Sequence, residues 1–175
     1  MMVSAVFTAR AQKLAVNTDV LMDALMTPSI GVEMTVGNWS TVGLNVLGNY
    51  KPYGKNMKFF GVQPEYRYYF SGRPMHSLFV GIGAVAGVYD TTIRGKVYDG
   101  VGYGGGVTFG YVMNITKRFH IDFHAGVALV GYNRKEYFVG DNYGDYIVDG
   151  INKTNASGYY IMPQRIGISL AYILK

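Results

Sequence analysis

Apolar residues alternate with small or polar residues along most of the chain. In the clearest segment, Val101 to Ile115, the odd positions are mostly large and apolar, and the even positions are mostly glycine. Side chains of a β-strand point alternately to opposite faces, so this pattern predicts a strand with one apolar face. The segment from Phe119 to Leu129 repeats the pattern, with His120, Asp122 and His124 on its other face.

The same phasing predicts eight strands along the chain. Their expected bounds are 14–25, 29–37, 40–50, 57–71, 76–90, 100–115, 118–137 and 157–174. Many of these strands are longer than the five or six residues usual in soluble sheets, and single-chain barrels of bacterial outer membranes have an even number of strands. For residues 12–175 we therefore predict an all-β fold, a closed antiparallel eight-stranded transmembrane β-barrel.

The connections between the predicted strands fall into two classes. The short ones lie at 37–39, 72–74 and 116–118, and the longer ones at 51–56, 91–99 and 136–156, with 27–29 as a short exception among the longer ones. Outer-membrane barrels have short periplasmic turns and longer outer loops. With both termini in the periplasm, the short turns all fall on the periplasmic side, so this alternation favours the membrane barrel.

The composition favours this barrel over a soluble sandwich or a lipocalin-like ligand carrier, which would also show alternation. A face in water normally carries many charges, but charged residues make up only 15% of this chain, beside 24 glycines, 16 tyrosines and 9 phenylalanines. We expect the apolar face to contact the lipid and lipopolysaccharide of a bacterial outer membrane. Aromatic side chains expected near the membrane interfaces are Trp39, Tyr50, Tyr66, Tyr68 and Phe70. The soluble lipocalin-like carrier stays open as an alternative.

The N-terminal segment and the charges bear on export and on partners. Residues 1–11 are mostly apolar and end in Ala9-Arg10-Ala11, which is typical of a signal-peptide cleavage site, so this segment is interpreted as a signal-peptide remnant or an N-terminal tail. The formal net charge is +5, but the cations stand singly or in pairs rather than in a stripe, so no nucleic-acid partner is expected. The chain has no cysteine, which excludes disulfides and thiolate metal sites.

A group of titratable residues is predicted to face the barrel interior. These residues are Asp19, Asp23, Glu33, Glu65, Arg67, His120, Asp122 and Arg165. The lumen of an eight-stranded barrel is filled by side chains, and an unpaired charge there is strongly destabilising. We therefore predict a structural charge network with Arg67 and Arg165 as its hubs. Closure places the last strand beside the first, so Arg165 is expected to reach Asp19 or Asp23.

No catalytic residue, metal site or cofactor is expected. His120 and His124 lie four residues apart on one strand face, which separates them by about 13 Å, too far to share a metal ion. The Gly81–Ala86 segment matches a dinucleotide-binding pattern, but the alternation continues through it and no helix follows. A lipid A-modifying enzyme stays open as an alternative, although such an enzyme needs a histidine near the outer leaflet, and the long loops contain none.

The longest predicted connection is the expected recognition surface. Its tyrosines and aspartates are Tyr137, Asp141, Tyr143, Asp145, Tyr146 and Asp149. Long connections in compact domains are often functional, and tyrosines are common in protein interfaces. We therefore expect a non-enzymatic structural or docking protein, or an accessory subunit of a larger outer-membrane assembly, with other outer-membrane proteins as partners.

Three segments resemble an uncharacterised family of Bacteroidetes outer-membrane barrels. They are the opening residues 17–33, the Gln-Pro-Glu-Tyr-Arg run within 62–70, and the closing residues 167–172. This family is a domain of unknown function whose members often lie near fimbrial genes. The resemblance covers residues 14–174 and implies the barrel fold and the outer-membrane location, but no activity. The chain departs from the usual pattern of such barrels at its end, where Lys175 stands in place of an aromatic residue.

Overall fold

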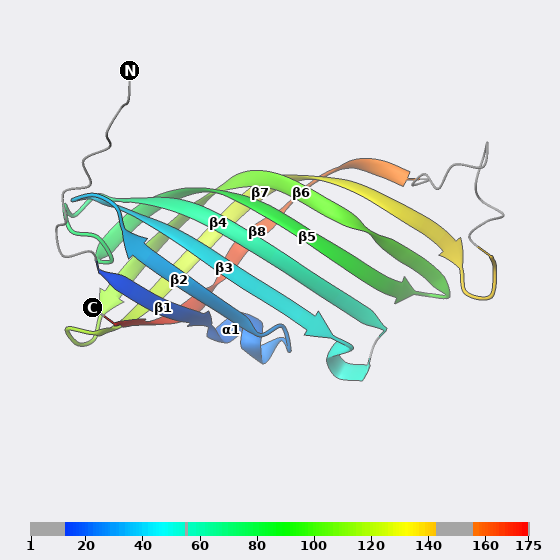
Figure 1. Ribbon diagram of the computed structural model, residues 1–175, viewed down its shortest axis with the longest axis horizontal. Helices are drawn as coiled ribbons and strands as arrows, with labels where there is room; N and C mark the ends of the chain where they lie inside the picture. Colours follow the sequence, from blue (N-terminus) through cyan, green and yellow to red (C-terminus); the bar gives the residue numbers. More distant parts are fainter. Residues whose placement is uncertain (1–12, 55, 143–155, 175) are drawn as a thin grey trace, which may run out of the picture.

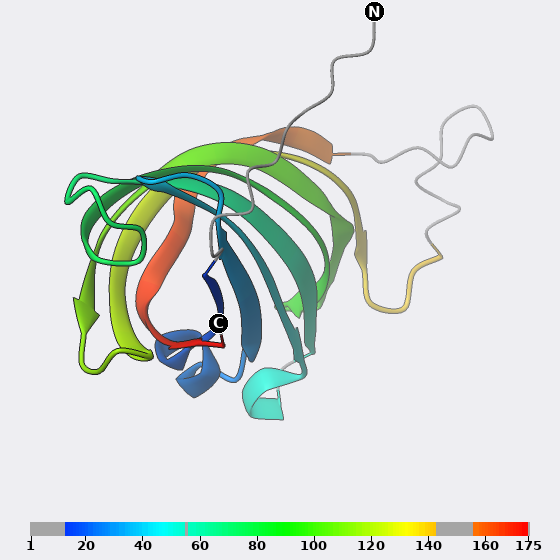
Figure 2. The same cartoon turned by 60° about the vertical axis from the view of Figure 1, so that its left-hand side comes forward.

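The protein is a closed ring of eight antiparallel strands in sequence order (Figures 1 and 2). The computed structural model describes residues 13–54, 56–142 and 156–174. The strands are β1 (Leu14–Asp19), β2 (Ser29–Thr35), β3 (Ser40–Tyr50), β4 (Met57–Tyr69), β5 (Ser77–Ile93), β6 (Lys96–Asn114), β7 (Phe119–Phe138) and β8 (Ala156–Ile173). Each strand pairs with its sequence neighbours, and β8 closes the ring by pairing with β1. The predicted closed, all-β antiparallel fold of eight strands is therefore confirmed.

The two ends of the barrel differ in their connections, as Figure 1 shows. At one end, here called the short-turn end, β1 begins, β8 ends, and turns link β2 to β3, β4 to β5 and β6 to β7. At the other, called the long-strand end, lie α1 (Val20–Ala24), the short 3-10 turn η1 (Pro52–Gly54) and the β5–β6 turn, and there β7 ends and β8 begins. No helix among the described residues has the length and apolar character needed to cross a membrane.

The first predicted strand, 14–25, is wrong in its second half. β1 ends at Asp19, and the chain continues as α1. The Asp19 carboxylate accepts hydrogen bonds from the backbone N–H groups of Leu21 at 3.0 Å and Met22 at 3.2 Å, as a helix N-cap does. Asp23 in turn accepts hydrogen bonds from Thr18 and from the backbone N–H of Ser29. Aspartate side chains that bond to the nearby backbone compete with strand pairing, which ends the strand.

The long connection predicted at 91–99 is also wrong. Strands β5 and β6 stay paired up to Ile93 and Lys96, and only Arg94 and Gly95 lie between them. Both turn residues have positive φ, 51° and 78°, as a type I′ hairpin turn requires. The twist of this turn matches that of the flanking strands, so the two strands stay paired right up to the turn.

The height of the barrel wall changes steeply around the ring (Figure 1). β1 has six residues and β2 has seven, whereas β6 has 19 and β7 has 20. The strand that closes the ring, β8, has 18 residues but pairs with β1 only from Ser169 to Ile173. The tallest and the lowest parts of the wall therefore meet at the β8–β1 junction.

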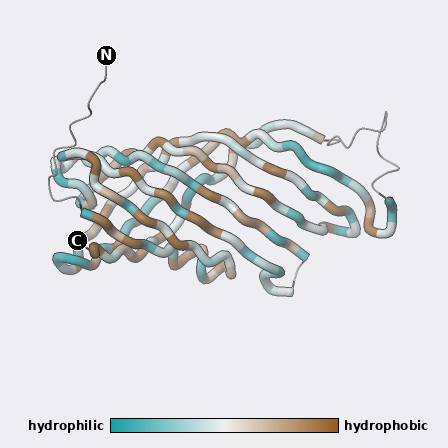
Figure 3. Tube along the Cα trace, in the orientation of Figure 1, coloured by the Kyte–Doolittle hydropathy of each residue, from teal (hydrophilic) through white to brown (hydrophobic). Residues whose placement is uncertain are grey.

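Polar and charged side chains fill the interior of the barrel, while large apolar side chains cover its exterior. Hydropathy alternates along the strands in Figure 3, and the buried residues include many charged or polar ones. Two small clusters of buried apolar residues lie at the short-turn end: Ala15, Met75 and Ile173, and Tyr69, Phe79 and Val112. This arrangement inverts the usual polarity of a soluble domain.

An irregularity in β8 places two consecutive side chains in the lumen. Between the pairs Ala125–Ile166 and Val127–Pro163, β8 holds one residue more than β7. Gln164 and Arg165 therefore both lie buried inside, where strict alternation would turn one of them outward. Such a β-bulge re-aims side chains, and a proline is tolerated beside it.

Candidate functional site: the charged lumen

Arg67 is the centre of the charge network in the lumen. Its Nε lies 2.6 Å from Glu65 Oε2, and its Nη1 lies 2.7 Å from Asp122 Oδ2 and 3.3 Å from Glu33 Oε2. The Arg67 side chain is only 3% exposed. The planar guanidinium presents donors in several fixed directions, so one arginine on β4 can join carboxylates from β2, β4 and β7.

The second carboxylate oxygen of Glu33 is bound by neutral side chains. Glu33 Oε1 accepts hydrogen bonds from Thr41 Oγ1 at 2.6 Å and from Tyr69 Oη at 2.7 Å. The Arg67 guanidinium also lies over the ring of Phe79, 4.4 Å from its centroid. A buried charge is tolerated when it is paired and its hydrogen bonds are satisfied, and the surroundings of Glu33 and Arg67 meet that condition.

Three further contacts extend the network toward β8 and β1. Arg165 Nη1 donates to Glu65 Oε2 over 2.9 Å. His124 Nε2 lies 2.9 Å from Asp19 Oδ2, and its Nδ1 lies 3.6 Å from Asp122 Oδ1. The groups therefore run from Asp19 through His124 and Asp122 to Arg67, and on through Glu65 to Arg165. This chain of contacts crosses the lumen and ties together walls that are distant in sequence.

The structure brings together most, but not all, of the predicted lumen residues. Asp19, Glu33, Glu65, Arg67, His120, Asp122 and Arg165 are buried. His120 stands apart from the carboxylates: its Nε2 lies 3.1 Å from the amide nitrogen of Asn114 near the short-turn end.

Two expectations about the lumen are wrong. Asp23 is exposed, because α1 carries it out of the wall. Arg165 forms its ion pair with Glu65 across the lumen, not with Asp19 or Asp23. Asp19 is paired with His124 instead.

The charge network predicted from sequence omits His124, although the predicted phasing places this histidine on the inner face. The available signal was its spacing of two from Asp122, because residues two apart on a strand share a face. The contact with Asp19, which lies 105 residues away along the chain, had no signal in the sequence.

Glycines on the inner face leave the space that the network occupies. A Cβ atom on Gly167 would lie 2.2 Å from Asp19 Oδ2, and one on Gly81 would lie 2.8 Å from Glu65 Oε1. A Cβ on Gly106 would lie 2.5 Å from the side-chain oxygen of Gln164. The glycine-rich face predicted from sequence is therefore the counterpart of large polar side chains on nearby strands.

A second charged cluster lies at the long-strand end. Arg134 Nε is 2.7 Å from Glu136 Oε1, and its guanidinium lies 5.0 Å from the ring centroid of Tyr98 and 4.5 Å from that of Tyr132. Lys96 also pairs with Glu136. We call Lys96, Tyr98, Tyr132, Arg134 and Glu136 the Arg134 cluster. The hydrogen bond from Lys96 lowers the pKa of Glu136 below its usual value, against a smaller effect of burial, and Arg134 lowers it further.

The predicted recognition loop is described only in part. Tyr137 belongs to β7, which is a correction, because it was placed in the loop. Asp141 lies just after β7, and its backbone N–H donates to the carbonyl of Phe138. The other residues of the prediction, Tyr143, Asp145, Tyr146 and Asp149, lie outside the described residues, as does the N-terminal segment 1–11.

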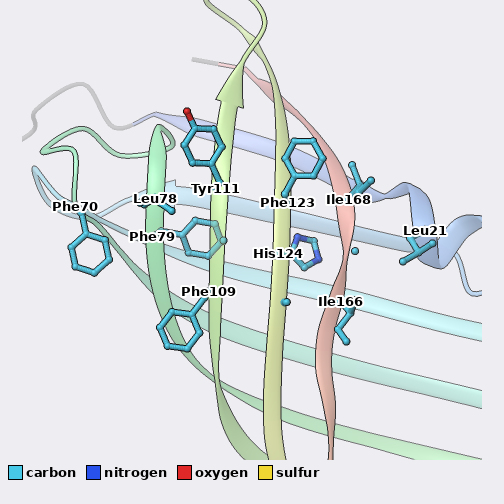
Figure 4. Close-up of a pocket in the computed structure, with 13 residues that line it drawn as sticks. Leu21, Phe70, Leu78, Phe79, Phe109, Tyr111, Phe123, His124, Ile166 and Ile168 are labelled. Atoms are coloured by element: carbon cyan, nitrogen blue, oxygen red, sulfur yellow. The ribbon is translucent and has the colours of Figure 1, made fainter.

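The outer wall carries an apolar hollow of about 730 Å³ (Figure 4). It crosses β5 to β8 and reaches Leu21 of α1. Gly110 and Gly167 line it, together with Phe109 and Ile168. His124 of the charge network also lines it. No group of three or more potential ligand side chains in the described part of the chain could hold a metal ion.

Comparison with known proteins assigns the chain to a family. Residues 1–174 match the family described as protein of unknown function (DUF3575). The chain belongs to this family. No significant match was found among curated proteins or among solved structures.

Proposed function

We propose that the protein is an integral β-barrel of a bacterial outer membrane, with a structural or docking role rather than an enzymatic one. The observation that carries this proposal is the inverted polarity of the barrel. Large apolar side chains stay exposed around the ring, for example Ile30, Ile82 and Phe109, while charged groups are buried inside. Soluble monomers rarely expose such extensive apolar surface, whereas a lipid-facing wall requires it.

The outward-facing residues suggest where the membrane boundaries lie. On β5 and β6 the apolar outward positions give way to Asp90 and Asp99, and on β7 they end at Leu129. Near the short-turn end, Trp39 and Tyr68 stack with ring centroids 6.1 Å apart, as aromatic side chains at a membrane interface often do. We assign the short-turn end to the periplasm and the long-strand end, with the Arg134 cluster, to the outside.

The lumen favours a structural role over transport or ligand binding. The Arg67 network joins side chains of five strands across the interior, which argues against a general pore. A lipocalin-like carrier would need an apolar cavity, whereas this lumen holds buried carboxylates and arginines. A lipid A-modifying enzyme would need a histidine near the outer leaflet, but all three histidines lie on β7 below the proposed boundary or in the turn before β5.

The tall strands support a docking role. A transmembrane strand needs about 9–11 residues, whereas β6 has 19 and β7 has 20. Their outer parts therefore extend beyond the proposed membrane boundary and offer a surface to other outer-membrane proteins. The resemblance of the segment around Gln63 and Arg67 extends the proposal to a Bacteroidetes outer membrane, where the chain would be an accessory subunit of a larger assembly.

An arginine scan along β6 tests the membrane location. Val107→Arg should lower the free energy of unfolding by about 2–4 kcal/mol in a bilayer, because it places a charge near the proposed midplane. The matched variant Val97→Arg, on the same strand beyond Asp99, should cost about 0–1 kcal/mol. Folding into lipid vesicles, followed by denaturant titration, measures both values. A protein that stays folded and monodisperse in water without detergent would refute the proposal.

A further inference from the structure

β8 has a long edge with no strand beside it among the described residues. On one side it pairs with β7 as far as Ala156, opposite Arg134. On the other side its pairing with β1 stops at Ser169, opposite Asp19. We call residues 156–168 the β8 edge. Helix α1 stands near its lower part, where Leu21 and Ile168 both border the outer hollow (Figure 4).

The upper part of the β8 edge, residues 156–162, lacks the features that usually protect such an edge. The only charged residue of the whole edge is Arg165, which is buried in the lumen. Natural edges carry lysines, prolines or bulges that prevent another strand from pairing. Here Pro163 and the bulge lie at the lower part, and residues 156–162 above them are uncharged. Tyr159 and Ile161 are 78% and 81% exposed, and both residue types favour strands.

Part of this edge falls within the proposed membrane. Ile161 lies opposite Leu129, the last apolar outward residue of β7, so the edge from Ile161 downward is at the depth of the lipid. Lipid offers no hydrogen bonds, and each unsatisfied backbone group there costs several kcal/mol. Within this segment the Gln164 carbonyl accepts a hydrogen bond from Gln63 Nε2. The other backbone groups on the β1 side favour an occupant that itself brings backbone donors and acceptors, because lipid chains cannot do so.

A second copy of the chain does not fit this edge. Copies in one membrane share their direction along the membrane normal and are related by rotation about it. Two β8 edges brought together in this way would cross at twice the strand tilt, roughly 70–90°. Antiparallel pairing of identical edges would need one copy to be inverted in the membrane. The geometry therefore points to a different polypeptide.

We propose that the β8 edge is the docking site for an extended segment of another protein, which adds to the barrel as a strand. The bound segment would lie beside β8 where the pairing with β1 has stopped at Asp19, and it would run antiparallel to β8. Main-chain hydrogen bonds would supply the affinity, as in other cases of strand addition. The segment should be uncharged and rich in β-branched or aromatic residues where it meets lipid. This inference rests on the proposed membrane location.

Site-specific photo-cross-linking in intact producing cells tests the inference. Benzoylphenylalanine is placed at Tyr159 or Ile161 on the edge, and at Ile82, which is 64% exposed on the wall of β5, as the matched control. We expect Ile82 to label lipid alone, and both edge positions to label one extended segment of one protein. Because the bound segment runs antiparallel to β8, the partner residue labelled from position 161 should come two positions before the one labelled from position 159.

The other labelling results contradict either the docking site or the membrane location. Labelling of lipid alone, of a second copy, of residues 20–28 of the same chain, or of protein residues without the two-residue register would overturn the docking site while leaving the membrane location intact. If the cross-linker at position 82 labels no lipid, the membrane location itself is wrong.

Proline substitution separates strand addition from simple contact. Neighbouring residues of a strand donate hydrogen bonds to opposite sides. Of Tyr160→Pro and Ile161→Pro, one should therefore weaken the pairing with β7 and lower the melting temperature. The other should leave the barrel folded but abolish the cross-link from position 159. If the variant that folds normally keeps the cross-link, the partner contacts side chains only, and strand addition is wrong.

Discussion

The barrel holds two arginine centres that differ in their surroundings. Arg67, inside the lumen, is 3% exposed and contacts three carboxylates. Arg134, at the long-strand end, is 19% exposed, and its ion pair is with Glu136. Aromatic rings accompany both, the ring of Phe79 beside Arg67 and those of Tyr98 and Tyr132 beside Arg134.

The difference teaches what burial does to an ion pair. In the lumen the loss of one partner leaves other charges without water, so the members of the network depend on each other. At the long-strand end solvent replaces a lost partner, and salt screens the attraction. The same residue types therefore form a structural core in one place and an adaptable surface in the other.

Replacing Arg67 should have the largest effect. Arg67→Met leaves Glu33, Glu65 and Asp122 without their shared partner, and should lower the free energy of unfolding by about 3–5 kcal/mol. Arg67→Lys should recover part of this loss, because lysine keeps the charge but not the planar fork of donors. Thermal melting in detergent measures both variants. A melting temperature equal to that of the parent would show that the lumen is hydrated.

Replacing Arg165 should have a smaller effect. Glu65 loses one charged hydrogen bond in Arg165→Met but keeps Arg67, so the expected loss is about 1.5–3 kcal/mol. The double variant with Arg67→Met tests the coupling, because both arginines contact Glu65. Strictly additive losses would contradict a shared network.

A glycine pair tests how tightly each region is packed. Gly167→Ala places a Cβ 2.2 Å from Asp19 Oδ2 and should separate Asp19 from His124, at about 1–3 kcal/mol. The control Gly131→Ala, toward the long-strand end, meets nothing closer than 3.7 Å, and should change stability by less than about 0.5 kcal/mol. Denaturant titration compares the two. Equal losses would mean that the two regions are packed alike.

Replacing Arg134 should have a small effect. Arg134→Met removes an ion pair near solvent and two ring contacts, and should lower stability by about 1 kcal/mol. Raising the salt concentration should shrink the difference from the parent, whereas the effect of Arg67→Met should persist. A loss as large as that of Arg67→Met would remove the distinction between the two centres.

The pH dependence should show the smallest effect. The pKa of Glu136 is lowered from its usual value of 4.5 in the folded state, so Glu136 stabilises the protein above that value. This contribution is lost as the pH falls through the lowered pKa. The difference in melting temperature between the parent and Glu136→Gln should therefore shrink on acidification. A difference that stays constant with pH would mean that the ion pairs of Glu136 add nothing.

Much of the fold could be predicted from local pattern, but strand ends and partners could not. The alternation placed Glu33, Glu65 and Arg67 on the inner face, where the structure also has them. It failed at Val20–Ala24, where the capping bonds of Asp19 outweigh a weak apolar alternation. It also failed at Arg94-Gly95, because the tight turn depends on two positive φ angles that the alternation does not encode.

The sequence by itself determined which side of the wall the residues of the regular strands occupy, because side-chain direction repeats every two residues along one strand. Which inner residues meet was decided by the tertiary structure alone. Arg165 reaches Glu65, 100 residues away along the chain, through the stagger of the closed ring and the bulge that places both Gln164 and Arg165 inside. The tertiary structure also decided that β8 extends beyond β1. The two strands pair only from Ser169 to Ile173, and the rest of β8 has no partner on that side among the described residues.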